Sequence, residues 1–214
     1  MAVWLNTTFY GLDTWAFTVC NNLSKFAGGI LTPLCELFAL FGKGGYFFIA
    51  FAVILLLFKN TRKAGVSMLF AMLVGLVLTN WTLKPLVSRP RPFTNPEYAG
   101  FWEQVGSHFE KSKSFPSGHT NVAMNSMLTF FLCSKNKKKS FWVFFIVAFM
   151  GFSRVYLIVH YLTDVIGGLI AGAIAGIVGY YLGKLLFLLI EKYKDTAFCK
   201  FILNADILNL AKKK

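Results

Sequence analysis

Long runs of apolar residues, separated by short polar or basic stretches, dominate this chain of 214 residues. A helix needs about 20 mainly apolar residues to cross the hydrocarbon core of a bilayer. The pattern therefore predicts an all-α, polytopic membrane helical bundle with six transmembrane helices. We place these helices at about 24–41, 44–58, 64–83, 118–134, 140–156 and 161–190.

The stretch before the first predicted span, residues 1–23, mixes aromatic and polar side chains, among them Trp15 and Asp13. This mixture favours an N-terminal interfacial amphipathic segment over a membrane span. The first span is the weakest of the six, because Pro33 and Glu36 interrupt it.

The last predicted span carries small residues at a spacing close to four, namely Gly168, Gly172, Gly176 and Gly179. Small residues at this spacing let two helices approach closely. We expect these glycines to form a packing face. No interdomain linker or internal repeat is evident, so residues 1–214 are expected to form a single membrane-embedded domain.

Composition supports a membrane protein, since 56% of the residues are hydrophobic and only 14% are charged. Soluble domains carry about 25% charged residues. The net charge of +13 raises the question of nucleic acid. Here, however, the charges lie in short clusters between apolar runs, which favours contact with membrane lipids and excludes a nucleic-acid partner. Four scattered cysteines give no disulfide framework and no zinc motif, and no obligate protein partner is indicated.

The basic clusters also predict an orientation, because Lys and Arg in short loops stay on the cytoplasmic side. The clusters lie at 59–63, 135–139 and 192–214, after the second, fourth and sixth spans. With six spans, both termini are expected to be cytoplasmic. The segments 83–117 and 155–161 then lie on the extracytoplasmic face of a multi-pass protein of the cell membrane.

Three short segments on that face carry chemistry: KPLVSRPRP at 84–92, FPSGHT at 115–120 and SRVYLIVHYLTD at 153–164. Cations close to membrane depth are costly and indicate function. Phosphoryl transfer requires positive charge around the three equatorial oxygens. Lys84, Arg91 and Arg154 are suited to supply it, as a point charge and two planar forks.

The PSGHT sequence precedes an apolar helix and suits an anion site. Ser117 is a candidate N-cap, and Gly118 allows the backbone to come close to a ligand. The N-terminus of a helix offers unpaired N–H groups to a phosphate. His119 is placed there to protonate a leaving oxygen as a general acid.

His160 and Asp164 stand four residues apart, which on a helix places them on one face. A carboxylate that accepts a hydrogen bond from one imidazole nitrogen leaves the other nitrogen unprotonated and nucleophilic. We therefore expect His160 to be the nucleophile and Asp164 to orient it.

Taken together, these segments resemble the three-part signature of the type 2 phosphatidic acid phosphatase family, whose catalytic architecture is shared with vanadium haloperoxidases. The first part of the signature is a lysine followed after six residues by Arg-Pro, and it matches Lys84 and Arg91-Pro92. The second part is Pro-Ser-Gly-His, which matches residues 116–119. The third part is Ser-Arg, then a histidine after five residues and an aspartate after three more, and it matches residues 153–164. The signature region is 84–164, and the resemblance implies the same catalytic roles for His160, His119 and Asp164. It also implies that the phosphoryl oxygens are held by Lys84, Arg91, Ser117, Gly118, Ser153 and Arg154, with no metal and no cofactor.

The expected function is a membrane lipid phosphatase acting through a phosphohistidine, with undecaprenyl diphosphate, converted to undecaprenyl phosphate, as the first substrate. Phosphatidic acid, diacylglycerol diphosphate, phosphatidylglycerol phosphate and lipid A stay open as alternatives. A transporter that binds a lipid headgroup, or a non-catalytic membrane protein, is the alternative from another class. The loop at 93–115 is expected to cover the entrance, with Glu97, Glu103 and Glu110 as solvated side chains.

Overall fold

The computed structural model describes residues 1–207, and the elements in this part of the chain are helices joined by turns. Within residues 1–207, four helical stretches are long and apolar enough to cross a membrane, which indicates a membrane location. These stretches are Tyr10–Leu57, Arg62–Thr94, Lys137–Tyr156 and Leu162–Lys192. The regular elements of this part of the chain are all helices, which confirms the all-α class.

The elements follow the predicted spans closely from residue 44 onward. In chain order they are α1 (Ala2–Thr8), α2 (Tyr10–Gly42), the 3₁₀ turn η1 (Lys43–Gly45), α3 (Tyr46–Leu57), α4 (Arg62–Leu76), the π-helical segment η2 (Val77–Leu83), α5 (Lys84–Val87), the 3₁₀ turn η3 (Pro92–Thr94), α6 (Pro96–Val105), α7 (Gly118–Cys133), α8 (Lys137–Ser140), α9 (Val143–Tyr156), α10 (Leu162–Lys192) and α11 (Ala197–Asn204).

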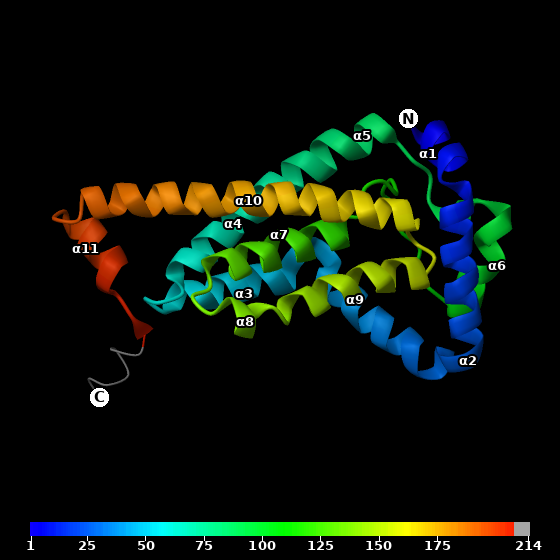
Figure 1. Cartoon of the computed structure of the whole chain (residues 1–214), viewed down its shortest axis with the longest axis horizontal. Coiled ribbons are helices and arrows are strands. Elements are labelled where there is room, and N and C mark those ends of the chain that lie inside the picture. The colour runs from blue at the N-terminus through cyan, green and yellow to red at the C-terminus, as the bar shows by residue number, and fades with distance from the viewer. Residues whose placement is uncertain (208–214) are drawn as a thin grey trace.

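The long helix α10 packs against α7 and α4 (Figure 1). Its glycines make this approach possible, as the sequence predicts. A methyl group added to Gly172 would lie 2.8 Å from the Asn121 carbonyl oxygen of α7, and one added to Gly179 would lie 2.4 Å from the Ala71 nitrogen of α4. The packing holds the first turn of α10 beside the first turn of α7.

The second half of α2 and the whole of α3 form one passage along the bundle, where the sequence predicts two separate spans at 24–41 and 44–58 (Figure 1). Only a short break separates them, where Gly44 and Gly45 take left-handed φ values of 59° and 70°. Side-chain contacts trace this passage. Thr32 and Phe38 of α2 contact Tyr156 and Phe149 of α9, and Phe51 of α3 contacts Phe130 near the C-terminal end of α7.

The first part of the chain does not run along the bundle. α1 and the first half of α2 lie across the ends of the other helices, and α2 bends at Ala27, whose φ of −129° is not helical (Figure 1). α6 packs on this segment through Tyr98, whose ring lies 4.8 Å from that of Phe17. The N-terminal end of the chain therefore lies at the opposite end of the bundle from α11.

Three chain segments that are far apart in sequence meet beneath this N-terminal segment. They are the α5–η3 connection, the start of α7 and the turn between α9 and α10. These are the three signature segments, so one end of the bundle carries all the residues with predicted chemistry.

Close packing at Gly179 predicts a measurable loss of stability. Gly179→Ala would place a methyl group against backbone atoms of Ala71, and such overpacking typically costs about 1–3 kcal/mol. Thermal unfolding in detergent should show a clear drop in Tm.

The matched control is Gly29→Ala in α2, because a methyl group there meets nothing within 4 Å. We expect this variant to unfold at or slightly above the wild-type Tm. Equal Tm values for the two variants would contradict the packing described for α10 and α4.

Candidate active site

His160 lies in the turn between α9 and α10, and its side chain is almost completely buried. The turn is tight: the Arg154 carbonyl accepts hydrogen bonds from the N–H groups of Val159 (3.3 Å) and His160 (3.2 Å). Ile158 has a φ of 54°, an uncommon conformation for a β-branched residue that often marks a functional site. The turn thus fixes where the imidazole points.

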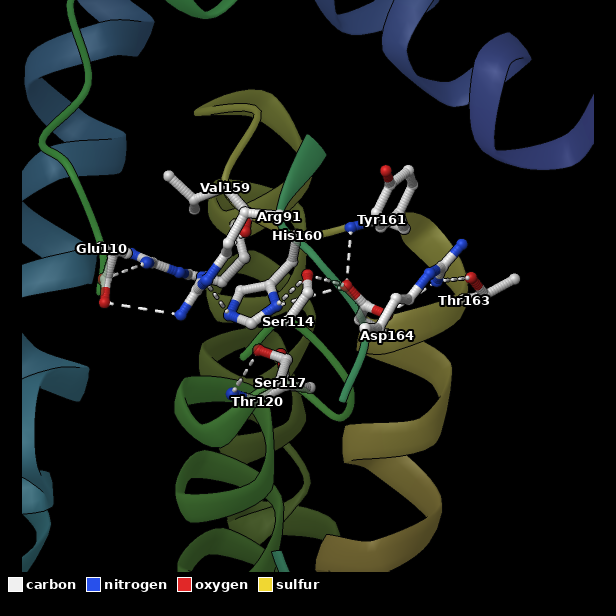
Figure 2. A network of polar contacts seen from close by, with 12 residues as sticks. Arg91, Glu110, Ser114, Ser117, Thr120, Val159, His160, Tyr161, Thr163 and Asp164 are labelled. Atoms are coloured by element: carbon white, nitrogen blue, oxygen red, sulfur yellow. Dashed lines mark hydrogen bonds and ion pairs between the residues drawn. The ribbon is translucent and has the colours of Figure 1, made fainter. Parts of the chain in front are cut away.

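The contacts of His160 define its tautomer (Figure 2). Nη1 of Arg91 lies 3.0 Å from Nε2, and a guanidinium can only donate hydrogen bonds. Nε2 is therefore unprotonated, and the proton of the neutral ring is on Nδ1. That nitrogen faces the carboxylate of Asp164, with Oδ2 at 3.4 Å.

Asp164 is held rigidly in the first turn of α10. Its Oδ2 accepts a hydrogen bond from the Tyr161 N–H at 3.0 Å and a short one from Ser114 Oγ, while Oδ1 accepts from Arg89 at 2.7 Å. His160 precedes the helix, so the two residues do not share a helical face as their spacing predicts. The capping interaction with Tyr161 brings them together instead.

Behind Asp164 lies a buried ion network that the sequence does not reveal. Arg89 is fully buried and also pairs with Asp13 of α2 at 2.9 Å. Its Nε donates to Asn6 Oδ1 at 2.7 Å, and its guanidinium lies 3.7 Å from the centre of the Tyr161 ring. The N-terminal segment therefore supports the site directly.

The predicted cations line or adjoin the same space. Arg91 donates to Ser112 and to the Val159 carbonyl, each at 2.8 Å. Lys84 Nζ lies 3.4 Å from Ser112 Oγ. Arg154 is buried and donates to Glu110 at 2.8 Å.

The first turn of α7 has the predicted N-cap, since Ser117 Oγ accepts from the Thr120 N–H. Gly118 lies close to Lys84, because a methyl group on it would be 3.8 Å from Nζ. His119 lines the same cavity as His160 and contacts the Ala39 carbonyl through Nε2 at 3.1 Å.

Two predicted phosphate ligands lie behind the cavity rather than on its wall. The hydroxyl group of Ser153 is buried and donates to the Met150 carbonyl at 2.8 Å. The hydroxyl group of Ser117 is buried in its capping role.

The cavity has a volume of about 470 Å³ and two chemically different parts. One end is cationic and contains Lys84, Arg91, His119 and His160. The other end continues between α3, α4 and α7 along apolar side chains that include Ile49, Leu69, Met72, Leu73 and Leu76. Such a space accepts a molecule with an anionic head and an apolar tail.

Burial and three neighbouring cations shape the acid–base behaviour of His160. Desolvation is the main cause that lowers the pKa of the imidazole well below its usual 6.5, and the charges of Arg91, Arg154 and Lys84 lower it further. The neutral, nucleophilic form is therefore favoured at neutral pH. In residues 1–207, no group of three or more His, Cys, Asp and Glu side chains is placed to hold a metal ion.

Comparison with known proteins identifies the group to which this arrangement belongs. Residues 64–187 match the family model of the PAP2 superfamily. An undecaprenyl-diphosphatase of Sulfolobus acidocaldarius is 32% identical over 128 residues, which cover 58% of this chain and 57% of the relative. The chain thus matches little more than half of that relative's length.

Two other relatives and one solved structure complete the comparison. Phosphatidylglycerophosphatase B of Bacillus subtilis is 33% identical over 63% of this chain and 61% of its own. Lipid A 4'-phosphatase of Porphyromonas gingivalis is 26% identical over 77% of this chain and 71% of its own. The crystal structure of Aquifex aeolicus LpxE has a TM-score of 0.61 at 24% identity, covering 78% of this chain and 94% of that chain, and so shows a shared fold.

The tautomer and charge of His160 can be measured directly. We expect the ¹⁵N signals of its ring to report a neutral imidazole, protonated on Nδ1, both at neutral pH and at pH 6.5, where an ordinary histidine is half protonated. The physical reason is that a lowered pKa keeps the ring uncharged until the pH falls well below the ordinary histidine range.

The chain contains three histidines, so the signal is assigned from its loss in His160→Asn, with exposed His108 as the internal reference. A His160 signal that gains a proton near pH 6.5 or above would contradict the electrostatic environment described here.

Proposed function

Because the chain belongs to the PAP2 superfamily, a family of lipid phosphatases, we propose that it hydrolyses a lipid phosphate or diphosphate through a phosphohistidine on His160. One observation carries this proposal: an unprotonated Nε2 faces a cavity whose near wall is cationic and whose far wall is apolar. A nucleophile, an anion site and space for a lipid tail are thereby combined.

In the proposed reaction, Arg91 shifts its hydrogen bond from Nε2 of His160 to a phosphoryl oxygen. The freed Nε2 lone pair attacks phosphorus, and the bond from phosphorus to the leaving oxygen breaks. His119 enters this step as the imidazolium. Its Nε2–H donates to the Ala39 carbonyl, and its second proton, on Nδ1, is transferred to the leaving oxygen, which leaves a neutral imidazole. Water then attacks the phosphohistidine, His119 takes up a proton, and inorganic phosphate and neutral His160 are released.

The positive charge for this reaction comes from side chains. Lys84, Arg91 and Arg154 neutralise the phosphoryl oxygens, and the first N–H groups of α7 at Gly118 add partial positive charge. Ser117 caps α7 directly before these N–H groups, and Ser117 and Ser153 stay among the residues that we propose to hold the phosphoryl oxygens. We therefore propose turnover without a metal ion.

For the substrate, we propose undecaprenyl diphosphate first. Its diphosphate suits the cationic end of the cavity and its long isoprenoid tail suits the apolar end. The Sulfolobus relative named for this lipid supports the choice, while the Bacillus and Porphyromonas relatives keep phosphatidylglycerol phosphate and lipid A as alternatives. Phosphatidic acid and diacylglycerol diphosphate are the other alternative substrates.

For the topology, we propose five passages through the membrane, with the site on the extracytoplasmic face and the N-terminal segment lying along that face as an interfacial segment. The expectation of six spans with both termini in the cytoplasm fits less well, because Asp13 lies at the site whereas α11 lies at the other end of the bundle. The basic clusters at 59–63, 135–139 and 192–200 gather at the end of α11, which supports a cytoplasmic location for that end.

The function is tested by a phosphate-release panel in detergent with EDTA present. The lipids are undecaprenyl diphosphate, phosphatidic acid, phosphatidylglycerol phosphate, diacylglycerol diphosphate and lipid A. We expect release in EDTA, highest with undecaprenyl diphosphate, and a loss of at least about a thousandfold in His160→Asn because the nucleophile is removed.

The matched control is His108→Asn, the same change at an exposed histidine of the α6–α7 loop, which should leave the rate unchanged. Lipid binding without phosphate release by the wild-type protein would favour a transporter or another non-catalytic membrane protein. Substantial turnover by His160→Asn would remove this residue from the nucleophile role.

The topology is tested by cysteine labelling in a background that lacks the four native cysteines. We expect a membrane-impermeant maleimide applied outside intact cells to label Thr7→Cys and His108→Cys but not Lys138→Cys, all three at exposed positions. Labelling of Thr7→Cys only after the cells are opened would support six spans instead.

A further inference from the structure

Glu110, in the connection between α6 and α7, pairs with two arginines of the site, and Figure 2 shows it beside one of them, Arg91. Its Oε1 accepts a hydrogen bond from Arg154 Nη2 at 2.8 Å, and its Oε2 lies 3.5 Å from Arg91 Nη2. The two arginine side chains are only 3% and 4% exposed, whereas Glu110 is 32% exposed. A carboxylate that is about one-third exposed thus pairs with two buried cations and offsets part of their charge.

This carboxylate differs from its neighbours in the same segment. The sequence predicts that Glu97, Glu103 and Glu110 are all solvated. Glu103 is indeed exposed, and Glu97 pairs with the hydroxyl group of exposed Tyr10. Only Glu110 of these three reaches the cationic end of the cavity.

Building on the proposed function, we propose that Glu110 is an internal competitor of phosphate: its carboxylate binds the arginines of the free enzyme and must leave when a phosphoryl group enters. A carboxylate and a phosphate present similar oxygen acceptors to a guanidinium. Two anions in one small buried site repel each other, so Arg91 and Arg154 cannot hold both at full strength.

Glu110 does not satisfy all the hydrogen-bond donors of the two arginines, which is why a phosphoryl group can replace it. Nε of Arg154 is buried and has no hydrogen-bond partner in the described part of the chain. The two oxygens of Glu110 are divided between two arginines. A phosphoryl group brings at least one more oxygen and can satisfy donors that the carboxylate leaves unpaired.

The exchange has two kinetic consequences. Displacing Glu110 costs binding free energy, which raises the KM for the lipid. After hydrolysis, the return of the carboxylate to the arginines favours the departure of inorganic phosphate, which weakens product inhibition. Glu110 thereby weakens the binding of the substrate and of the free phosphate product alike.

The test compares Glu110→Gln with Glu103→Gln, the same change at an exposed position of α6. The probe is inorganic phosphate, and its Kd is measured by calorimetry on the purified protein in detergent. Glutamine keeps the shape of the side chain but removes its charge, so we expect phosphate to bind Glu110→Gln about tenfold more tightly, on the scale of one charge-assisted hydrogen bond. Glu103→Gln should bind phosphate as the wild type does.

Kinetics on the same variants give the second measurement. Glu110→Gln should show a lower KM and a lower Ki for inorganic phosphate. Equal or weaker phosphate binding by Glu110→Gln overturns the proposal, since a residue that only holds the arginines in place would weaken binding when changed. Glu110→Ala repeats the comparison without an amide that can still accept hydrogen bonds.

Phosphate binding does not require turnover, so this test is separate from that of the proposed function. If the wild-type protein releases phosphate from none of the lipids, the proposed phosphatase activity fails, and the calorimetric comparison still decides whether Glu110 competes with an anion.

Discussion

One buried guanidinium, that of Arg89, joins two carboxylates that lie far apart in the sequence. It pairs with Asp13 of the N-terminal helix and with Asp164 at the start of α10. A buried charge is tolerated only when it is paired and hydrogen-bonded, and removing one partner of such a pair typically costs about 3–5 kcal/mol. The position of Asp164, and through it the orientation of His160, therefore depends on the N-terminal segment staying in place.

A second constraint is the charge balance around His160. Burial is the main cause that lowers the pKa of the His160 imidazole, and the positive charges of Arg91, Arg154 and Lys84 lower it further. Glu110 offsets part of this positive charge. The cations proposed to bind a phosphoryl group therefore also contribute to keeping Nε2 of His160 unprotonated.

Local sequence patterns predict the parts of the fold and site that local forces determine. The apolar runs from 44 to 190 give helices near their predicted bounds, Ser117 caps α7, and the glycines of α10 form a packing face. The sequence also predicts that the three signature segments lie close together, because the expected topology places all three on the same side of the membrane. The path of the chain before residue 44 is harder to predict from the sequence. A helix that bends at Ala27 and then lies across the ends of the bundle has the same apolar composition as two short membrane spans.

Long-range pairings account for the rest of what the sequence does not predict. Arg89 and Asp13 are separated by 76 positions, and no periodicity connects them. Glu110 looks like any acidic residue of a loop until the fold places it between Arg91 and Arg154. Ser153 fits a signature but donates its hydroxyl group to a helix carbonyl. Such roles depend on tertiary distance, which composition and spacing do not contain.

The two histidines of the site rest on different parts of the structure. His160 is oriented by Asp164 and the N-terminal segment, whereas His119 contacts the Ala39 carbonyl and lies against Gly42, where an added methyl group would be 2.3 Å from its ring. Gly42 ends α2 at the break before α3. A shift of the chain at this break would therefore move His119 while leaving the hydrogen-bond partners of His160 unchanged.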